Sequence, residues 1–102
     1  MYILKLGVTF EWDPTKARAN AQKHGVTFDE AVTVFFDTRG LDGPDVLHST
    51  VEPRRLRLGC SIDERDLIVA YTLRSSTDGE TTRIISARQA NSRDRALFAS
   101  KD

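Results

Sequence analysis

Apolar and polar residues follow two different periods along the chain, and each period predicts a type of element. Residues 3–12 are apolar and β-prone, which predicts a strand or an extended arm that Gly7 interrupts. Between residues 28 and 36 the apolar side chains recur at helical spacing, at Phe28, Ala31, Val32, Phe35 and Phe36. Alternating or continuous apolar runs predict three further strands, at residues 54–62, 67–74 and 81–88.

Capping residues set the ends of the first predicted helix. Asp13 and Pro14 indicate a helix start, because an aspartate side chain can accept the free N–H groups and proline has none to satisfy at the first position. The helix is expected to end near His24, since Gly25 suits the left-handed residue that often follows a helix.

Two more helices are indicated by their first residues. Thr27 and Glu30 have the spacing of a capping box, so a second helix is expected from there to about Phe36. Ser92 is expected to cap a short C-terminal helix that ends near Ser100.

The order of these elements is strand, helix, helix, three strands and a helix. It predicts an α+β fold, a compact antiparallel sheet packed against two N-terminal helices with a short C-terminal helix. No linker interrupts the pattern, so residues 1–102 are expected to form a single domain in which residues 1–9 add a strand or an arm. Residues 37–51 are expected to be a polar loop, and Cys60, the only cysteine, a small core residue.

Charge is balanced overall but unevenly distributed. The formal net charge is zero, which gives no bulk argument for a nucleic-acid partner. Residues 51–102 nevertheless contain ten lysines and arginines, and nine of them are arginine, the cation best suited to bidentate phosphate contacts. No apolar run approaches the roughly 20 residues of a membrane-spanning helix, and the N-terminus has no signal-peptide pattern. We therefore expect a cytoplasmic protein without membrane contacts.

The candidate chemistry is that of cations rather than of metals. The sequence has no glycine-rich phosphate loop, no paired-histidine metal spacing and no nucleophile elbow, and its carboxylates do not cluster at the ends of apolar strands. A ribonuclease that uses the 2′-OH of its own substrate needs an acid–base group and cations that stabilise charge on the phosphate. One histidine, one lysine and several arginines are sufficient for that reaction without a metal.

Lys23 and His24 would supply the first two groups, and two interpretations of them stay open. Cations in the last helical turn complement the negative end of the helix dipole, so the pair can be a purely structural helix end capped by Gly25. The same position favours the charged imidazolium, which suits a general acid. His48, in the predicted loop, is expected to be a solvated residue.

The arginines also have structural explanations. Arg54, Arg55 and Arg57 fit a solvated strand face and sheet edge, and Arg74 fits a strand end that reaches solvent. Arg83 and Arg88 are five positions apart, so in a regular strand they point to opposite faces. Only a bulge or the strand end would allow both to line one pocket.

Two blocks of residues resemble a known family. The first block is Phe10-Glu11-Trp12-Asp13-Pro14, Lys16, Asn20, Lys23-His24-Gly25-Val26, Phe28, Glu30-Ala31, Val34-Phe35 and Asp37. The second block is Glu52, Arg54, Leu58-Gly59, Tyr71-Thr72, Arg74, Arg83-Ile84-Ile85-Ser86-Ala87-Arg88 and Ala90. Together they resemble the BrnT toxins of type II toxin–antitoxin systems over roughly residues 10–98.

The resemblance implies a RelE-like fold and a metal-independent endoribonuclease, without a cofactor, that blocks translation and growth. It implies a ribbon-helix-helix antitoxin of the BrnA kind as partner, in a 2:2 heterotetramer that contacts operator DNA only through the antitoxin. The positions that match the family's active residues are Lys23, His24, Arg74 and Arg88, and those expected to bind RNA phosphates are Arg54 and Arg83.

The last predicted helix departs from the family's pattern. The family usually has Glu followed by Tyr there, where this chain has Asp94 and Phe98. Two functions therefore stay open. One is an active endoribonuclease toxin, and the other is a catalytically weak or inactive binding module that acts with the antitoxin in operon autoregulation.

Overall fold

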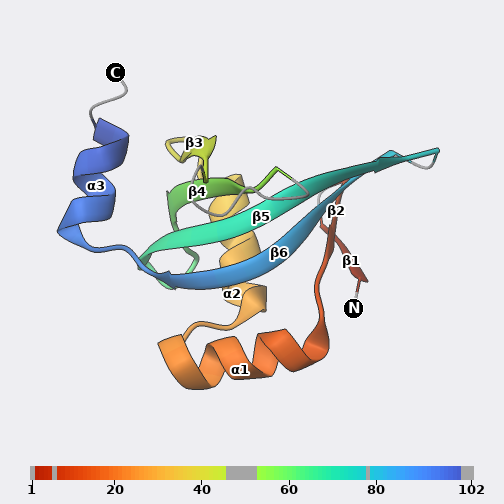
Figure 1. The fold of residues 1–102 in the computed structure, drawn as a ribbon, viewed down its shortest axis with the longest axis horizontal. Coiled ribbons are helices and arrows are strands. Elements are labelled where there is room, and N and C mark those ends of the chain that lie inside the picture. The colour runs from red at the N-terminus through yellow and green to blue at the C-terminus, as the bar shows by residue number, and fades with distance from the viewer. Residues whose placement is uncertain (1, 6, 46–52, 78, 100–102) are drawn as a thin grey trace.

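The computed structural model describes residues 2–5, 7–45, 53–77 and 79–99 (Figure 1). His48, which is expected to be a solvated loop residue, lies outside these described residues. In chain order the elements are β1 (Tyr2–Lys5), β2 (Val8–Glu11), α1 (Pro14–His24), α2 (Phe28–Thr33), the 3-10 helix η1 (Val34–Phe36), β3 (Leu41–Pro44), β4 (Arg55–Cys60), β5 (Asp66–Ser76), β6 (Gly79–Gln89) and α3 (Ser92–Ala99). None of the helices in the described residues is long and apolar enough to span a membrane.

The strands form one sheet in the order β1-β2-β6-β5-β4-β3. The antiparallel meander β4-β5-β6 is confirmed, and so is the α+β class. The sheet is mixed rather than wholly antiparallel, because β2 pairs with β6 in the parallel direction. No tight turn joins these two strands, which are separated by both N-terminal helices, so nothing forces them to run in opposite directions.

The N-terminal segment is a hairpin rather than a single arm. β1 and β2 pair antiparallel, and Gly7 lies between them with a φ of 81°. A positive φ of this size is readily adopted only by glycine, which explains why the apolar run breaks at this residue.

The caps of α1 are those that the sequence predicts. The Asp13 carboxylate accepts a hydrogen bond from the Thr15 N–H at 2.8 Å, and Pro14 occupies the first helical position. Gly25 follows in the left-handed conformation, with its N–H donating to the Ala21 carbonyl at 2.9 Å. Lys23 and His24 therefore do lie in the last turn of a capped helix.

Only half of the predicted capping box forms at α2. The Thr27 hydroxyl accepts a hydrogen bond from the Glu30 N–H at 3.1 Å, as expected. The Glu30 carboxylate instead turns inward, where it accepts a hydrogen bond from Ser61 at 2.7 Å and pairs with Arg65. The hydrogen bond from Arg65 lowers the pKa of Glu30. The carboxylate thus links α2 to the turn between β4 and β5.

The C-terminal helix begins where predicted but with a different cap. The Asp94 N–H donates to the Asn91 side-chain oxygen, and the Asn91 N–H donates to the Asp94 carboxylate, both at 2.9 Å. Asn91, rather than Ser92, therefore makes the reciprocal capping contact, because its side chain stands three residues before an acidic group.

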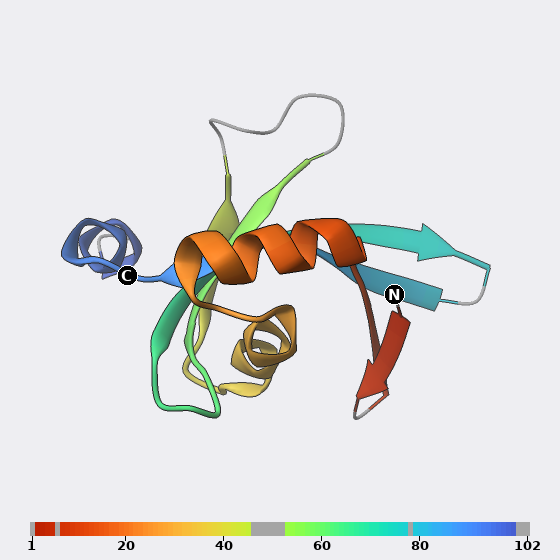
Figure 2. The ribbon, with the colours of Figure 1, turned by 90° about the horizontal axis from the view of Figure 1, so that it is seen from below.

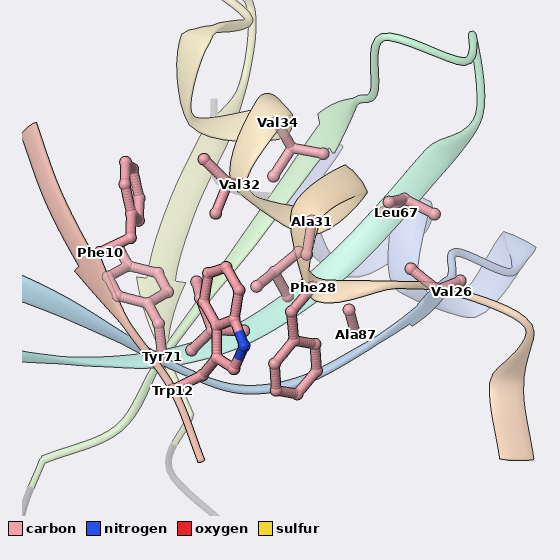
Figure 3. Close-up of a cluster of buried hydrophobic side chains, with 12 residues drawn as sticks. Phe10, Trp12, Val26, Phe28, Ala31, Val32, Val34, Leu67, Tyr71 and Ala87 are labelled. Atoms are coloured by element: carbon pink, nitrogen blue, oxygen red, sulfur yellow. The ribbon is translucent and has the colours of Figure 1, made fainter. Parts of the chain in front are cut away.

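The hydrophobic core lies between the sheet and the layer formed by α2 and η1 (Figure 3). Phe10 and Phe28 are fully or almost fully buried, and Trp12 meets Phe28 edge to face with ring centroids 6.0 Å apart. Phe35 lies edge-on to both Phe10 and Tyr71. Burying each large side chain of this kind contributes about 1.5–3 kcal/mol, so the core fixes the sheet against the helices.

Helix α1 lies on the same side of the sheet as α2 and runs along β6 (Figures 1 and 2). The buried amide of Asn20 donates to the Ala87 carbonyl at 2.8 Å and accepts from the Ala87 N–H at 3.1 Å. It also donates to the Val26 carbonyl at 2.9 Å. Asn20 thus forms hydrogen bonds with β6 backbone groups that would otherwise lack a partner at this sheet edge.

Two predictions about β4 are wrong. Cys60 is exposed, and Gly59 occupies the buried position instead, where a side chain would come within 3.0 Å of the Val34 carbonyl oxygen. Arg57 is not on a solvated face. Its guanidinium lies over the Phe35 ring at 5.6 Å and donates to the Val34 carbonyl at 2.9 Å, so it ties η1 to the sheet.

The predicted loop at residues 37–51 contains an element in its first half. β3 pairs antiparallel with β4, with Gly43 opposite Leu56. Asp42 in β3 pairs with Arg57 and accepts a hydrogen bond from the Tyr71 hydroxyl. Neither contact is visible in an apolar pattern, since β3 consists of Leu-Asp-Gly-Pro.

Candidate functional site

A β-bulge in β6 decides which arginines share a face. Ala70 pairs with Ser86, but the next residue, Tyr71, pairs with Ile84, so Ile85 is an extra residue without a partner in β5. The extra residue reverses the alternation of the strand beyond it. Arg83 and Arg88 therefore point to the same face of the sheet, which is the exception that the sequence pattern allowed.

That face is the one turned away from the core. Val69, Tyr71, Ile84 and Ala87 belong to the core, so the residues that alternate with them point to the other side. The register places four arginines on that other side, and we call it the arginine face: Arg54, Arg74, Arg83 and Arg88. No helix of the described residues covers the middle of this face (Figure 1).

The residues of the arginine face form rows across the strands. Ser86, Ala70, Leu56 and Gly43 make one row. Arg88, Ile68, Leu58 and Leu41 make the next. On the other side of the first row, Glu11, Arg83 and Thr72 lie in line. Arg54 adjoins Thr72, because it lies one residue beyond the pair formed by Arg55 and Tyr71.

A hollow of about 300 Å³ opens on the arginine face over strands β4, β5 and β6. Its lining is Asp45, Arg54, Leu56, Ile68, Ala70, Ser86 and Arg88. Three of these side chains are aliphatic, two are arginines, one is a hydroxyl and one is a carboxylate. The hollow therefore combines an apolar base with charged groups at its rim.

Each end of the arginine face holds a carboxylate beside its arginines. The Glu11 carboxylate is buried, 3.5 Å from the guanidinium of Arg83 and 3.8 Å from that of Arg74. At the other end Asp94 binds Arg88 with two hydrogen bonds, of 2.6 and 3.0 Å. The Arg88 hydrogen bond lowers the pKa of Asp94, and the same contact raises the pKa of Arg88. Asp94 thus holds Arg88 in place as a cation.

The ion pair leaves Arg88 with capacity for another ligand. A guanidinium has five N–H donors. In the described residues three of them are used, two by Asp94 and one by the Gln89 carbonyl at 3.4 Å. With 42% of its side chain exposed, Arg88 can contact a phosphate while Asp94 orients it.

Lys23 and His24 lie at the same end of the sheet as Arg88. Asn20, one turn before them, is bonded to Ala87, the residue that precedes Arg88. Gly25, just after them, accepts a hydrogen bond from Arg65 at 3.1 Å, next to the start of β5. Lys23 is exposed and His24 is half-buried. The helix end therefore stands at the edge of the sheet where β6 finishes.

Arg74 is not part of that end. The four residues that match the family's active positions, Lys23, His24, Arg74 and Arg88, therefore do not form one centre. Arg88 is opposite Ile68 and Arg74 is six residues further along β5. Six residues of extended strand span roughly 20 Å. Arg74 instead shares the Glu11 carboxylate with Arg83. The arginine face therefore holds one group of charged residues at Glu11 and another at Arg88, while Lys23 and His24 belong to α1, which packs on the core side of the sheet.

Three residues of this face escaped the sequence analysis as site residues. Glu11 could have been noticed, because it is the polar residue between two buried aromatic ones. The sequence pattern does not predict that Ser86 lies on this face, because its orientation depends on the bulge. Asp45 could not be predicted either, because it falls within the predicted loop. In the described residues no group of three or more potential metal-ligating side chains is present.

Comparison with known families matches this chain over most of its length. A family model described as the ribonuclease toxin BrnT of type II toxin–antitoxin systems matches residues 12–94. The chain belongs to the BrnT family. The match confirms the resemblance, and the matched residues include Lys23, His24 and all four arginines of the arginine face. BrnT proteins are ribonuclease toxins that belong with an antitoxin partner. The comparison with curated proteins gave no match.

Proposed function

We propose that this protein is an endoribonuclease toxin that cleaves RNA without a metal ion and thereby blocks translation and growth. The observation that supports it most is the alignment of four arginines on the one sheet face that no described helix covers. RNA offers a chain of phosphates, and arginine binds phosphate bidentately. Arginines spread along one face of the sheet therefore suit the backbone of a single RNA strand.

In this proposal the RNA strand follows β5 and β6. Arg83 and Arg74 bind phosphates near Glu11, and Arg54 and Arg88 bind phosphates beside the hollow. Because roughly 20 Å separates the rows of Arg74 and Arg88, the two contact different nucleotides. Arg74, expected from the resemblance to be catalytic, is therefore assigned to binding and orientation of the strand.

The chemical step is assigned to the end of the sheet that holds both Arg88 and the last turn of α1. The 2′-oxygen loses its proton and attacks the adjacent phosphorus, and the bond to the 5′-oxygen breaks as that oxygen receives a proton. The products are a 2′,3′-cyclic phosphate and a 5′-hydroxyl. His24 acts as general acid or base, while Lys23 and Arg88 stabilise the negative charge on the phosphorane.

The partner that this proposal requires is a ribbon-helix-helix antitoxin of the BrnA kind. We propose a 2:2 heterotetramer, since a dimeric antitoxin offers two equivalent toxin sites. Operator DNA is then contacted by the antitoxin alone. The proposed place of action is the cytoplasm, where messenger RNA is translated.

One observation favours the alternative of a weak or inactive binding module. Arg88 is held by two hydrogen bonds to Asp94, and Phe98, which stands where the family usually has a tyrosine, is buried and has no hydroxyl. If a tyrosine hydroxyl were needed for chemistry, this copy would bind RNA or antitoxin without cleaving.

Two experiments distinguish an active toxin from an inactive binding module. The protein is induced in growing cells, and the purified protein is assayed for RNA cleavage. We expect growth arrest, and cleavage of a generic RNA at an unchanged rate when EDTA is added, because no step uses a metal. Absence of both arrest and cleavage would leave the binding module, and cleavage that stops with EDTA would refute the metal-free reaction. The control is the same protein prepared in complex with its antitoxin, which inactivates it.

A further inference from the structure

We propose that the hollow on the arginine face binds one unpaired guanine base of the RNA substrate. This inference rests on the proposed function, since it assigns the base that accompanies the cleaved phosphate. It goes beyond phosphate binding, which does not by itself distinguish one RNA sequence from another.

The lining of the hollow suits a base better than a phosphate. Leu56, Ile68 and Ala70 form its apolar part, from two neighbouring strands. Ile68 and Ala70 are buried, with 4% and 7% of their surfaces exposed. A phosphate gains nothing from aliphatic contacts, whereas the flat face of a base gains by leaving water against them. The volume of about 300 Å³ is large enough for a purine.

Asp45 gives the hollow its selectivity for a particular base. Among the described residues it is the only acidic one that lines the hollow, and 8% of its surface is exposed. An ionised carboxylate only accepts hydrogen bonds, through two oxygens. Guanine offers two adjacent donors on its Watson–Crick edge, the N1–H and the 2-amino group. Adenine and cytosine place an acceptor beside their amino group, so they offer such a carboxylate one donor only.

The backbone fixes where Asp45 stands. Its N–H donates to the Arg54 carbonyl at 2.8 Å, which extends the pairing of β3 and β4 by one residue. Because residues that face each other on paired strands point to the same side, Asp45 and Arg54 are neighbours on the arginine face. Asp45 and Arg54 therefore stand side by side at the rim of the hollow, where the proposed base edge meets the carboxylate.

The position of the hollow relates this base to the reaction. Arg88 lines the same hollow and belongs to the end of the sheet assigned to chemistry. On β6, Ser86 lies opposite Ala70 and Arg88 lies opposite Ile68, so both flank the apolar part of the hollow. A guanine in the hollow thus places its own phosphate, or the next one, at Arg88.

Binding of uncleavable RNA tests the inference independently of catalysis. Short 2′-O-methyl oligouridylates lack the attacking hydroxyl, and one central position is made guanine, inosine or adenine. By fluorescence anisotropy we expect the guanine strand to bind roughly 5- to 100-fold more tightly than the adenine strand. Inosine, which keeps N1–H but lacks the 2-amino group, is expected between the two. Equal affinity for all three strands would overturn the inference.

The variant Asp45→Asn provides the second measurement. Its amide has one acceptor oxygen, so the preference for guanine over adenine should fall to within about twofold while the affinity for the adenine strand is kept. Asp63→Asn, which changes an exposed aspartate outside the hollow, should keep the wild-type preference. A preference that survives Asp45→Asn in a folded variant would refute the role of Asp45. Guanine selectivity without cleavage would instead refute the proposed enzyme and retain the base site.

Discussion

Replacement of His24 by alanine is expected to slow RNA cleavage by roughly 100- to 10,000-fold, the usual contribution of a positioned acid or base. His24 is the only histidine in the described residues, and it lies at the end of the sheet where Arg88 also lies. The measurement is the single-turnover cleavage rate of a labelled RNA at saturating protein.

The structural role of His24 predicts a much smaller effect on stability. A cation in the last turn of an exposed helix contributes about 0.3–1 kcal/mol, and the α1 caps at Asp13 and Gly25 remain in the variant. The free energy of unfolding should therefore fall by no more than about 1 kcal/mol. Gln22→Ala, which truncates an exposed residue in the same turn, is the control. If His24→Ala cleaved RNA at the wild-type rate, His24 would have only a structural role at the end of α1.

Replacement of Arg88 by alanine is expected to lower the cleavage rate by roughly 100- to 1,000-fold, the effect of removing one donor to a developing negative charge. Arg88 keeps free N–H donors beside its pair with Asp94, so the charge it supplies is available to a phosphate. Arg88→Lys should recover part of the rate, because an ammonium supplies charge without the two parallel hydrogen bonds.

Arg95→Ala is the matched control for Arg88. Arg95 is also an arginine near the β6 end of the sheet, and it pairs with Asp66 at 3.3 Å with half of its side chain exposed. Its loss should leave the cleavage rate within about twofold, since an exposed ion pair contributes about 0–1 kcal/mol to stability and Arg95 does not line the hollow. Equal losses in both variants would mean that the effect of Arg88 is one of general charge.

Helix ends and apolar strands could be predicted because their determinants are local. Asp13, Gly25 and Thr27 each act on backbone groups a few residues away, and all three cap as expected. The run Leu67–Tyr71 is apolar enough to identify the central strand whatever its neighbours are. Such signals give the elements and the order of the meander.

The partners of polar residues could not be predicted, because they depend on distant parts of the chain. Glu30 has the spacing of a local cap but finds Arg65 and Ser61 across the fold. The strand pattern predicts a surface position for Arg57, yet the packing of η1 brings Phe35 and the Val34 carbonyl against it. The parallel pairing of β2 with β6 likewise depends on tertiary packing, and no turn residue predicts it.

The site itself depended on one extra residue. Counting along residues 83–88 places Arg83 and Arg88 on opposite faces, and only the bulge at Ile85 brings them together. The hollow has the same origin, since Ser86 and Arg88 line it only in this register. Asp45 joins it by following β3, whose sequence Leu-Asp-Gly-Pro does not predict a strand. Residue types therefore indicated the chemistry, while the geometry came from the sheet.

The chemical nature of the RNA ends is the most direct measurement of the proposed reaction. Cleavage of a defined RNA by the purified protein in EDTA should leave a 2′,3′-cyclic phosphate on one fragment and a 5′-hydroxyl on the other. A single 2′-deoxy substitution at the cleaved nucleotide should abolish that cut. Fragments that end in a 5′-phosphate and a 3′-hydroxyl, formed only when a divalent metal is present, would contradict the proposed mechanism.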